Sequence, residues 1–240
     1  MLADSGCGTR SEVKKIIKSK RVKINDITVI DGAVIIEPDK DIVTLDGKTV
    51  HYEKYRYYMF NKPAGCVSAT RDKLSITVLE YLKDEVTKDL FPVGRLDKDT
   101  EGFLLITNDG NLAHNLLSPK KHVDKVYYAE VSRELSDGDM LNFRNGVDIG
   151  DEKKTLPAMI ETAENRHLAD KDSRGAYLVT LREGRFHQVK RMFEAFSSEV
   201  LFLKRESMGK VMLDKELEPG KYRLLTREEV DMLKNIQGDG

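Results

Sequence analysis

The sequence predicts an α+β protein in two parts, a small N-terminal module over residues 1–54 and a larger domain over residues 55–240. Strand and helix patterns alternate irregularly in the larger part, which favours a mixed, largely antiparallel sheet flanked by helices over a parallel doubly wound sheet. Hydrophobic residues make up 40% of the chain and charged residues 34%, the balance of a globular protein with enough apolar material for a core.

The N-terminal module begins with a helix signal. Thr9 is a predicted N-cap, and Glu12 three residues later completes a capping box. Apolar residues then recur at helical spacing, at Val13, Ile16 and Ile17. Residues 21–52 alternate β-branched side chains with turn dipeptides, which predicts short strands. We therefore expect a helix with a basic outer face beside a small sheet.

The larger domain contains four clear strand signals and four helix signals. The apolar runs typical of strands are residues 56–62, 102–107, 125–132 and 175–183. The first of these runs is stopped by Pro63 and Gly65. Amphipathic patterns predict helices over residues 75–86, 111–118, 185–196 and 226–236. A second capping box, from Thr226 to Glu229, starts the last helix.

Composition limits the class of protein. No apolar run approaches the ~20 residues of a membrane helix, and the N-terminus has no secretory signal. The only two cysteines, Cys7 and Cys66, lack metal-ligand spacing, so we expect free thiols and a cytoplasmic protein. The net charge is −1, but basic residues cluster over residues 10–23 and 185–191. These clusters suit local docking of a polyanion, and a solvated helix face is the alternative for each.

The stretch "VGRLDKDTEGFLLITNDG", residues 93–110, carries three closely spaced acids, Asp97, Asp99 and Glu101. A calcium loop is excluded, because Asn108 stands where the closing bidentate carboxylate belongs. A solvated turn before a buried strand explains Asp99 and Glu101. It does not explain why a leucine stands between Arg95 and Asp97, an arrangement that suits a positioned and partly shielded acid. Residue chemistry alone leaves both interpretations open.

The segment "TRSEVKKIIKSKRVKIND" resembles the S4 RNA-binding module. That family usually has an additional turn ahead of "LADSG", whereas this sequence starts at Met1-Leu2, so we expect a shortened first helix. The resemblance implies that the basic residues of the module contact the RNA backbone. These are Arg10, Lys14, Lys15, Lys18 and Arg21.

Four ordered motifs in the larger domain resemble those of pseudouridine synthases of the RsuA and RluA kind. They are "YYMFNKPAGCVS", "GRLDKDTEGFLLITNDG", "HVDKVYYAEV" and "LREGRFHQVKRMF". The resemblance implies that Asp97 is the catalytic carboxylate and that Lys190 is its basic partner. Tyr127 matches the family tyrosine, which stacks on the base and is a candidate for proton transfer from C5, and its neighbour Tyr128 is the register alternative. The implied reaction needs no metal and no cofactor.

Further residues are implied at the RNA contact by their motif positions, namely Arg95, Arg185, His187, Gln188 and Lys62. Arg95 is expected to bind phosphate or to fill the space that a flipped-out uridine leaves. Lys62 either supports the fold or contacts the RNA backbone. His187 either hydrogen-bonds RNA or is a satisfied structural histidine.

The third motif, "EGRFHQVKRMF", looks like the small-subunit pattern of this group. It therefore implies one uridine of 16S ribosomal RNA as the target, presented on an assembling ribosomal particle to a monomeric enzyme that binds no membrane. Three alternatives stay open. They are a synthase acting on 23S ribosomal RNA, a non-catalytic RNA-binding or ribosome-assembly protein, and a glycosidic hydrolase that uses a second carboxylate.

Overall fold

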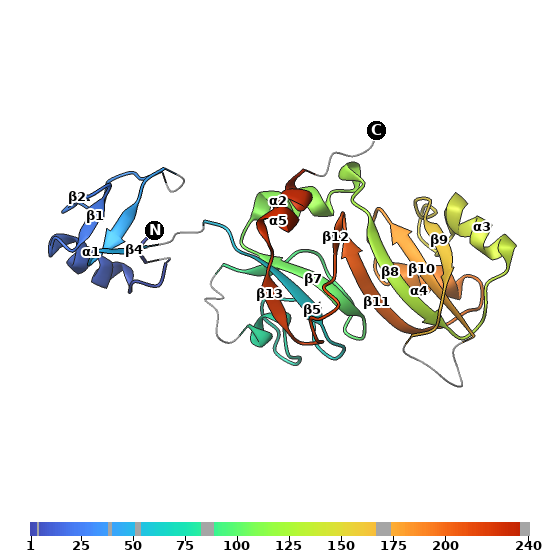
Figure 1. Cartoon of the computed structure of the whole chain (residues 1–240). Helices are drawn as coiled ribbons and strands as arrows, with labels where there is room; N and C mark the ends of the chain where they lie inside the picture. Colours follow the sequence, from blue (N-terminus) through green and yellow to red (C-terminus); the bar gives the residue numbers. More distant parts are fainter. Residues whose placement is uncertain (4, 38–39, 51–53, 83–88, 167–173, 236–240) are drawn as a thin grey trace. The chain divides into compact units, whose positions relative to one another are not determined.

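The computed structural model describes residues 1–240 except 4, 38–39, 51–53, 83–88, 167–173 and 236–240. The chain divides into two compact units, Met1–Arg56 and Tyr57–Gly240 (Figure 1). Each unit has its own sheet and its own core. Cys7 and Cys66 are both free thiols.

The N-terminal unit is one helix and a four-stranded antiparallel sheet of order β2-β1-β3-β4. Its elements are α1 (Arg10–Lys18), β1 (Val22–Ile24), β2 (Ile27–Thr28), β3 (Val43–Leu45) and β4 (Lys48–Thr49). The predicted capping box is confirmed, since the Thr9 hydroxyl accepts from the Glu12 amide and the Glu12 carboxylate accepts from the Thr9 amide. Val13 and Ile17 turn inward to the core, and the lysines of the helix stay outside.

The larger unit is built on one mixed sheet of order β13-β5-β7-β11-β8-β10-β9, with β6 beside β7 and β12 beside β11. The strands are β5 (Tyr57–Lys62), β6 (Phe91–Pro92), β7 (Glu101–Thr107), β8 (Lys125–Val131), β9 (Met159–Ala163), β10 (Gly175–Leu181), β11 (Val200–Met208), β12 (Val211–Met212) and β13 (Tyr222–Leu224). Every pairing is antiparallel except that of β7 with β11. The predicted mixed, largely antiparallel sheet is confirmed.

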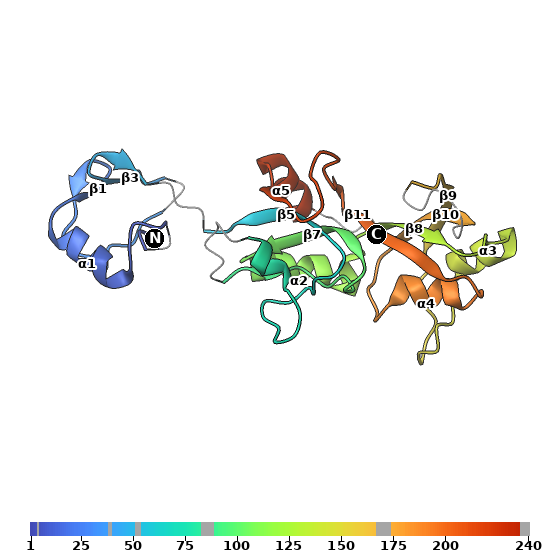
Figure 2. The same ribbon diagram turned by 90° about the horizontal axis from the view of Figure 1, so that it is seen from below.

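Four helices flank this sheet, and two short 3₁₀ segments interrupt its connections. They are α2 (Gly110–Leu117), α3 (Asp137–Asn145), α4 (Gln188–Glu194) and α5 (Arg227–Lys234), with η1 (Val78–Tyr81) and η2 (Pro119–Lys121). In Figure 2, α3 and α4 lie at the β8–β10–β9 end of the sheet, whereas α2 and α5 lie at the β5–β7 end. The capping box of Thr226 and Glu229 starts α5, as predicted.

Two buried clusters among the described residues of the larger unit lie toward opposite ends of the sheet. One joins β5, β7 and η1 and includes Leu96, which directly precedes Asp97. The other joins β8, β9 and β10 to α3 and α4 around Phe143 and Phe193. Tyr127 packs against both clusters, so it lies where the two ends of the sheet meet.

The helix predicted over residues 75–86 is wrong over its described part. Only Val78–Tyr81 is helical, as a 3₁₀ segment, and residues 83–88 lie outside the described residues. The side chain of Glu80 accepts from the Thr77 amide, so this local cap accounts for the helical signal. The helix predicted over residues 185–196 is shorter, since α4 begins at Gln188 after His187 adopts a left-handed conformation.

Gly102 gives a direct test of the sheet geometry. Its φ is +98°, and an added Cβ would lie 2.2 Å from the Arg205 carbonyl oxygen of the neighbouring strand. We expect Gly102→Ala to lower the free energy of unfolding by at least about 3 kcal/mol, because both backbone strain and a steric clash oppose it. Urea unfolding measures this change. Gly110→Ala is the control, since a Cβ there meets nothing within 4 Å. Equal midpoints for the two variants would contradict the described geometry.

Candidate active site

Asp97 lies in the turn that connects β6 to β7. Leu96 is buried in the core and Arg95 is exposed, so the chain alternates inward and outward just before the acid. The Thr100 amide donates to the Asp97 carbonyl and closes the turn. The Asp97 side chain is 28% exposed. The structure thus has a carboxylate that is held by its backbone and partly shielded from water.

The first motif holds this turn from below. The ammonium group of Lys62 donates to the carbonyls of Thr100, Lys98 and Pro63 at 2.8, 3.2 and 3.1 Å. The Ser68 hydroxyl both donates to and accepts from the backbone of Leu96, at 3.0 Å in each case. Burial lowers the pKa of Lys62 despite the nearby acids. The expected RNA contact of Lys62 is corrected, because the side chain is fully buried and two of its three hydrogen bonds go to carbonyls of the Asp97 turn.

The third motif brings His187 to Asp97. The imidazole Nε2 lies 3.6 Å from Asp97 Oδ1. The Phe186 ring stacks on His187 at 3.8 Å between ring centroids and 17° between planes, and Phe186 is 75% exposed. An exposed aromatic ring therefore stacks on the histidine that lies next to the carboxylate. Phe186 was missed by the sequence interpretation, although an exposed aromatic beside a basic cluster is typical of nucleic-acid contacts.

The sequence predicts that Lys190 pairs with Asp97. In the structure Lys190 pairs with Asp99 instead. Its ammonium group lies 2.5 Å from Asp99 Oδ2. Burial opposes ionisation of Asp99, but the hydrogen bond and charge of Lys190 outweigh it and lower the pKa of that carboxyl. Next to Asp97 the position of a basic partner is taken by His187, the residue that precedes α4. Asp99 is therefore a residue of the connecting turn that also binds the lysine of the third motif.

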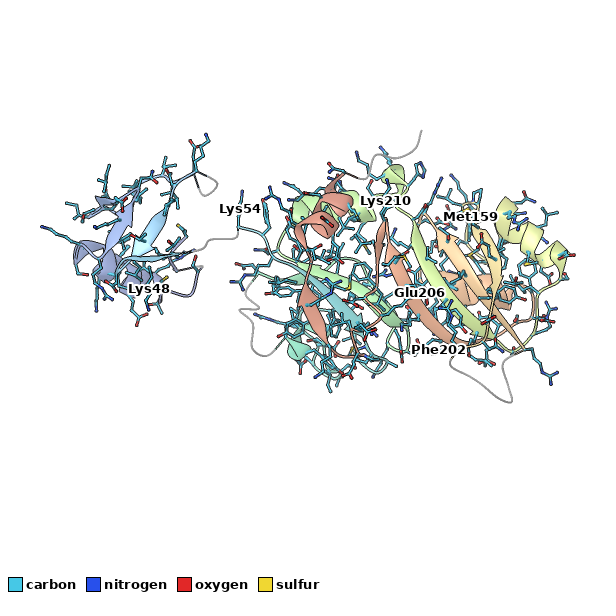
Figure 3. All side chains as sticks on the ribbon, viewed as in Figure 1. Lys48, Lys54, Met159, Phe202, Glu206 and Lys210 are labelled. Carbon is cyan, nitrogen blue, oxygen red and sulfur yellow. The ribbon has the colours of Figure 1, made fainter. Side chains whose placement is uncertain are left out.

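Tyr127 and Tyr128 lie on opposite faces of β8. The Tyr128 hydroxyl donates to the buried Glu130. Burial raises the pKa of Tyr128 most, and the hydrogen bond to Glu130 raises it further. Phe202 and Glu206 of β11, labelled in Figure 3, belong to the same face, since Phe202 contacts the Tyr128 ring and Glu206 binds Arg166. Tyr128 is therefore fixed inside a separate network, and Tyr127 is the half-buried tyrosine between the two cores.

Arg205 of β11 contacts Tyr127 and was not predicted. Its Nε donates to the Phe103 carbonyl at 2.8 Å, and its Nη1 lies 3.5 Å from the Tyr127 hydroxyl. The guanidinium carbon lies 6.0 Å from the centre of the Tyr127 ring. The sequence held no clear signal for Arg205, because it stands between Lys204 and Glu206 in the stretch "VLFLKRESM" and is not distinguished from them by spacing.

Arg185 and Gln188 brace the loop before α4. The expected RNA contact of the buried Gln188 is corrected, and that of Arg185, whose side chain is 25% exposed, stays a prediction. The Arg185 guanidinium donates to Glu183, to Asp151 and to the carbonyls of Lys153 and Lys154. Gln188 is buried, accepts from the Arg185 amide at 2.9 Å and donates to Glu183 at 2.8 Å. Both side chains use their hydrogen-bonding groups inside the protein, because this loop has to hold His187 in its left-handed conformation.

The other predicted RNA contacts are exposed. Arg95 forms no ion pair with any described residue, and the same holds in the N-terminal unit for Arg10, Lys14, Lys15 and Lys18. Arg21 differs, since it pairs with Asp46 at 2.5 Å. In the described part of the chain no cluster of three His, Cys, Asp or Glu side chains is arranged to hold a metal ion. No helix there has the length and apolar character needed to cross a membrane.

Comparisons with known proteins agree on one family. The family model described as RNA pseudouridylate synthase matches residues 56–195. An uncharacterized RNA pseudouridine synthase of Bacillus subtilis, YtzG, is 46% identical over 99% of this chain and 98% of its own length. Ribosomal small subunit pseudouridine synthase A of Yersinia pestis is 39% identical over 92% of this chain and 91% of its own. A crystal structure of a pseudouridylate synthase superposes with a TM-score of 0.67 at 35% identity, covering 97% of this chain and 96% of that one.

Lys125, two residues before Tyr127, gives a pH-dependent prediction. Burial, and then the charge of Arg205, lower its pKa to about 8 from 10.5. Between these values the unfolded chain binds more protons than the folded one, so the free energy of unfolding rises with pH. We expect this rise in the wild type, and not in Lys125→Met, to be on the order of 1 kcal/mol between about pH 7.5 and about pH 9.5. Urea unfolding at both pH values measures it, and equal changes in the two proteins would contradict it.

Proposed function

The chain belongs to the RNA pseudouridylate synthase family, and on that premise we propose that it converts one uridine of small-subunit (16S) ribosomal RNA to pseudouridine, with Asp97 as the reacting carboxylate. Family membership makes the chain a pseudouridine synthase. The choice of RNA is supported by relatives that are named for the small ribosomal subunit. The single observation that carries the role of Asp97 is its turn, which Lys62 and Ser68 hold by the backbone while the carboxylate stays partly open.

The reaction is an isomerisation in which atoms and electrons balance within one nucleotide. The N1–C1′ bond breaks, N1 keeps the electron pair, the uracil turns, and C5 bonds to C1′. The proton on C5 leaves and N1 gains a proton. Attack of the carboxylate at C1′, its attack at C6, and formation of a glycal all require an ionised carboxylate beside the sugar and the base. Asp97 fills that role in each path.

The Asp97 carboxylate has a histidine beside it, and its turn binds a lysine. His187 Nε2 lies 3.6 Å away, and Lys190 is held at Asp99, two residues along the same turn. Because Lys190 lowers the pKa of Asp99, that residue is a poor proton donor at neutral pH. The general acid that a glycosidic hydrolase needs is therefore not supplied by Asp99, which favours the isomerase over that alternative.

The surroundings suit a uridine that has left its stack. We assign Tyr127 to contact with the base, because its ring lies between the two cores and remains half-exposed. Arg95 is exposed beside Asp97 and suits a flanking phosphate or the space that the uridine vacates. The open face of Phe186 suits stacking by a neighbouring base.

The N-terminal unit is proposed to be an S4-type RNA-binding module. Its helix presents Arg10, Lys14, Lys15 and Lys18 without acidic partners among the described residues, as phosphate contacts require. Arg21 contributes less, because Asp46 already neutralises it. Phosphate contacts fix position and add affinity, while the larger unit selects the uridine. The substrate is proposed to be ribosomal RNA on an assembling particle, bound by a monomer.

Tritium release tests the activity and the role of Asp97 together. RNA labelled with tritium at uridine C5 loses the label only when C5 gives up its hydrogen. We expect release from 16S ribosomal RNA or its particle, and a loss of at least about 10³-fold in Asp97→Asn. Asp99→Asn is the matched variant in the same turn, and its loss is expected to stay below about tenfold because the Asp99 side chain is 70% exposed.

Three outcomes would contradict this assignment. Activity of Asp97→Asn close to that of the wild type would remove the role of Asp97. No release from any small-subunit RNA or particle would remove the proposed substrate, and release from 23S ribosomal RNA instead would assign the enzyme to the large subunit.

Salt dependence of binding tests the N-terminal unit. Replacing Lys14, Lys15 and Lys18 with Gln should weaken binding to all RNA sequences alike and reduce the slope of log K against log salt by about 2 to 3, because each phosphate contact releases roughly one counterion. Filter binding over a range of salt concentrations measures the slope. Lys40→Gln is the control, since this ammonium group pairs with Glu37 at 2.6 Å. An unchanged slope in the triple variant would make the helix a solvated face only.

A further inference from the structure

The two ends of the large sheet meet through a very short contact. Strand β7, which follows the Asp97 turn, pairs with β11 only at Glu101 with Lys204 and at Gly102 with Arg205. By contrast, β11 pairs with β8 along almost its whole length, although two irregularities interrupt the register. Figure 1 shows β7 and β11 diverging beyond their contact. The separation between Asp97 and Tyr127 therefore depends on this narrow join.

The side chain of Arg205 spans the join on the Tyr127 face. From β11 it reaches the Phe103 carbonyl on β7 with Nε at 2.8 Å, and the Tyr127 hydroxyl on β8 with Nη1 at 3.5 Å. One planar guanidinium thus contacts the strand that follows the Asp97 turn and the tyrosine proposed to contact the base. No contact between strands β7 and β8 themselves is needed, because β11 lies between them.

Stability alone does not explain an arginine here. Arg205 is 2% exposed, forms no ion pair with any described carboxylate, and its Nη2 has no hydrogen-bond partner. A buried charge without a carboxylate and an unsatisfied buried donor both cost free energy. Arg166 on the opposite face shows the ordinary arrangement, since it lies 4.7 Å from the Tyr128 ring centre and also pairs with Glu206 at 2.7 Å.

We propose that Arg205 is a positioning residue for uridine isomerisation, which holds Tyr127 in a fixed relation to β7 and so to the Asp97 turn. This inference rests on the proposed function. Lysine at this position keeps the charge, but a single ammonium group cannot reproduce the planar pair of donors that reaches the carbonyl and the hydroxyl. The buried guanidinium charge and the unpaired Nη2 donor lower stability, and in return one side chain connects β7 with Tyr127 of β8.

A double-mutant cycle tests this proposal. Single-turnover tritium release and RNA binding are measured separately for the wild type, Arg205→Lys, Tyr127→Phe and the double variant. If Arg205 acts through Tyr127, Arg205→Lys lowers the rate constant at least about tenfold in the wild type but less than about threefold in Tyr127→Phe, and Kd for RNA stays within about twofold. Arg166→Lys is the matched control, with a rate constant close to that of the wild type.

The opposite results overturn the proposal. Equal fold-losses in both backgrounds make Arg205 a general structural residue, as does weaker RNA binding with an unchanged rate constant. If Tyr127→Phe has no measurable rate, the ring ¹³C resonance of Tyr127 in the free protein decides, since it should shift in Arg205→Lys and not in Arg166→Lys. If Arg205→Lys does not fold, Arg205→Gln takes its place. Absence of tritium release in the wild type contradicts the proposed function, and the resonance measurement still decides the role of Arg205.

Discussion

The ammonium group of Lys62 is the interaction on which the arrangement of the site depends. It is fully buried, and it donates to two backbone carbonyls of the Asp97 turn and to the carbonyl of Pro63. A buried ammonium is costly unless its donors are satisfied, so the turn and the lysine require each other. This turn points the Asp97 side chain outward and the Leu96 side chain into the core, and it leads the chain into β7. The first two motifs are therefore one structural unit that presents a single carboxylate.

Local chemistry made part of this molecule predictable. The two capping boxes and the Leu96–Asp97 alternation depend on neighbouring residues, and the sequence indicated each of them correctly. What it did not indicate depends on contacts between distant residues. The insertion of β11 between β7 and β8 brings Arg205 to Tyr127, and the start of α4 sends Lys190 to Asp99. No local pattern encodes such pairings, because side-chain spacing reports a face of an element and not its neighbours.

The neighbouring tyrosines of β8 show how a strand separates two tasks. Tyr128 is closed in by Glu130, Phe202 and Arg166, and its hydroxyl is committed to a buried carboxylate. Tyr127 on the other face has Arg205 beside its hydroxyl and stays partly exposed. Because successive side chains of a strand point to opposite faces, one residue of register decides which ring is enclosed and which stays partly open to solvent.

The short pairing of β7 with β11 has a mechanical consequence. A sheet resists bending through its interstrand hydrogen bonds, and here only two residue pairs resist it at the centre. A small tilt of one end of the sheet against the other would change the spacing of Asp97 and Tyr127 across the join. The stiffness of this join, together with the Arg205 side chain that spans it, limits how far the Asp97 turn and the Tyr127 ring can move relative to each other.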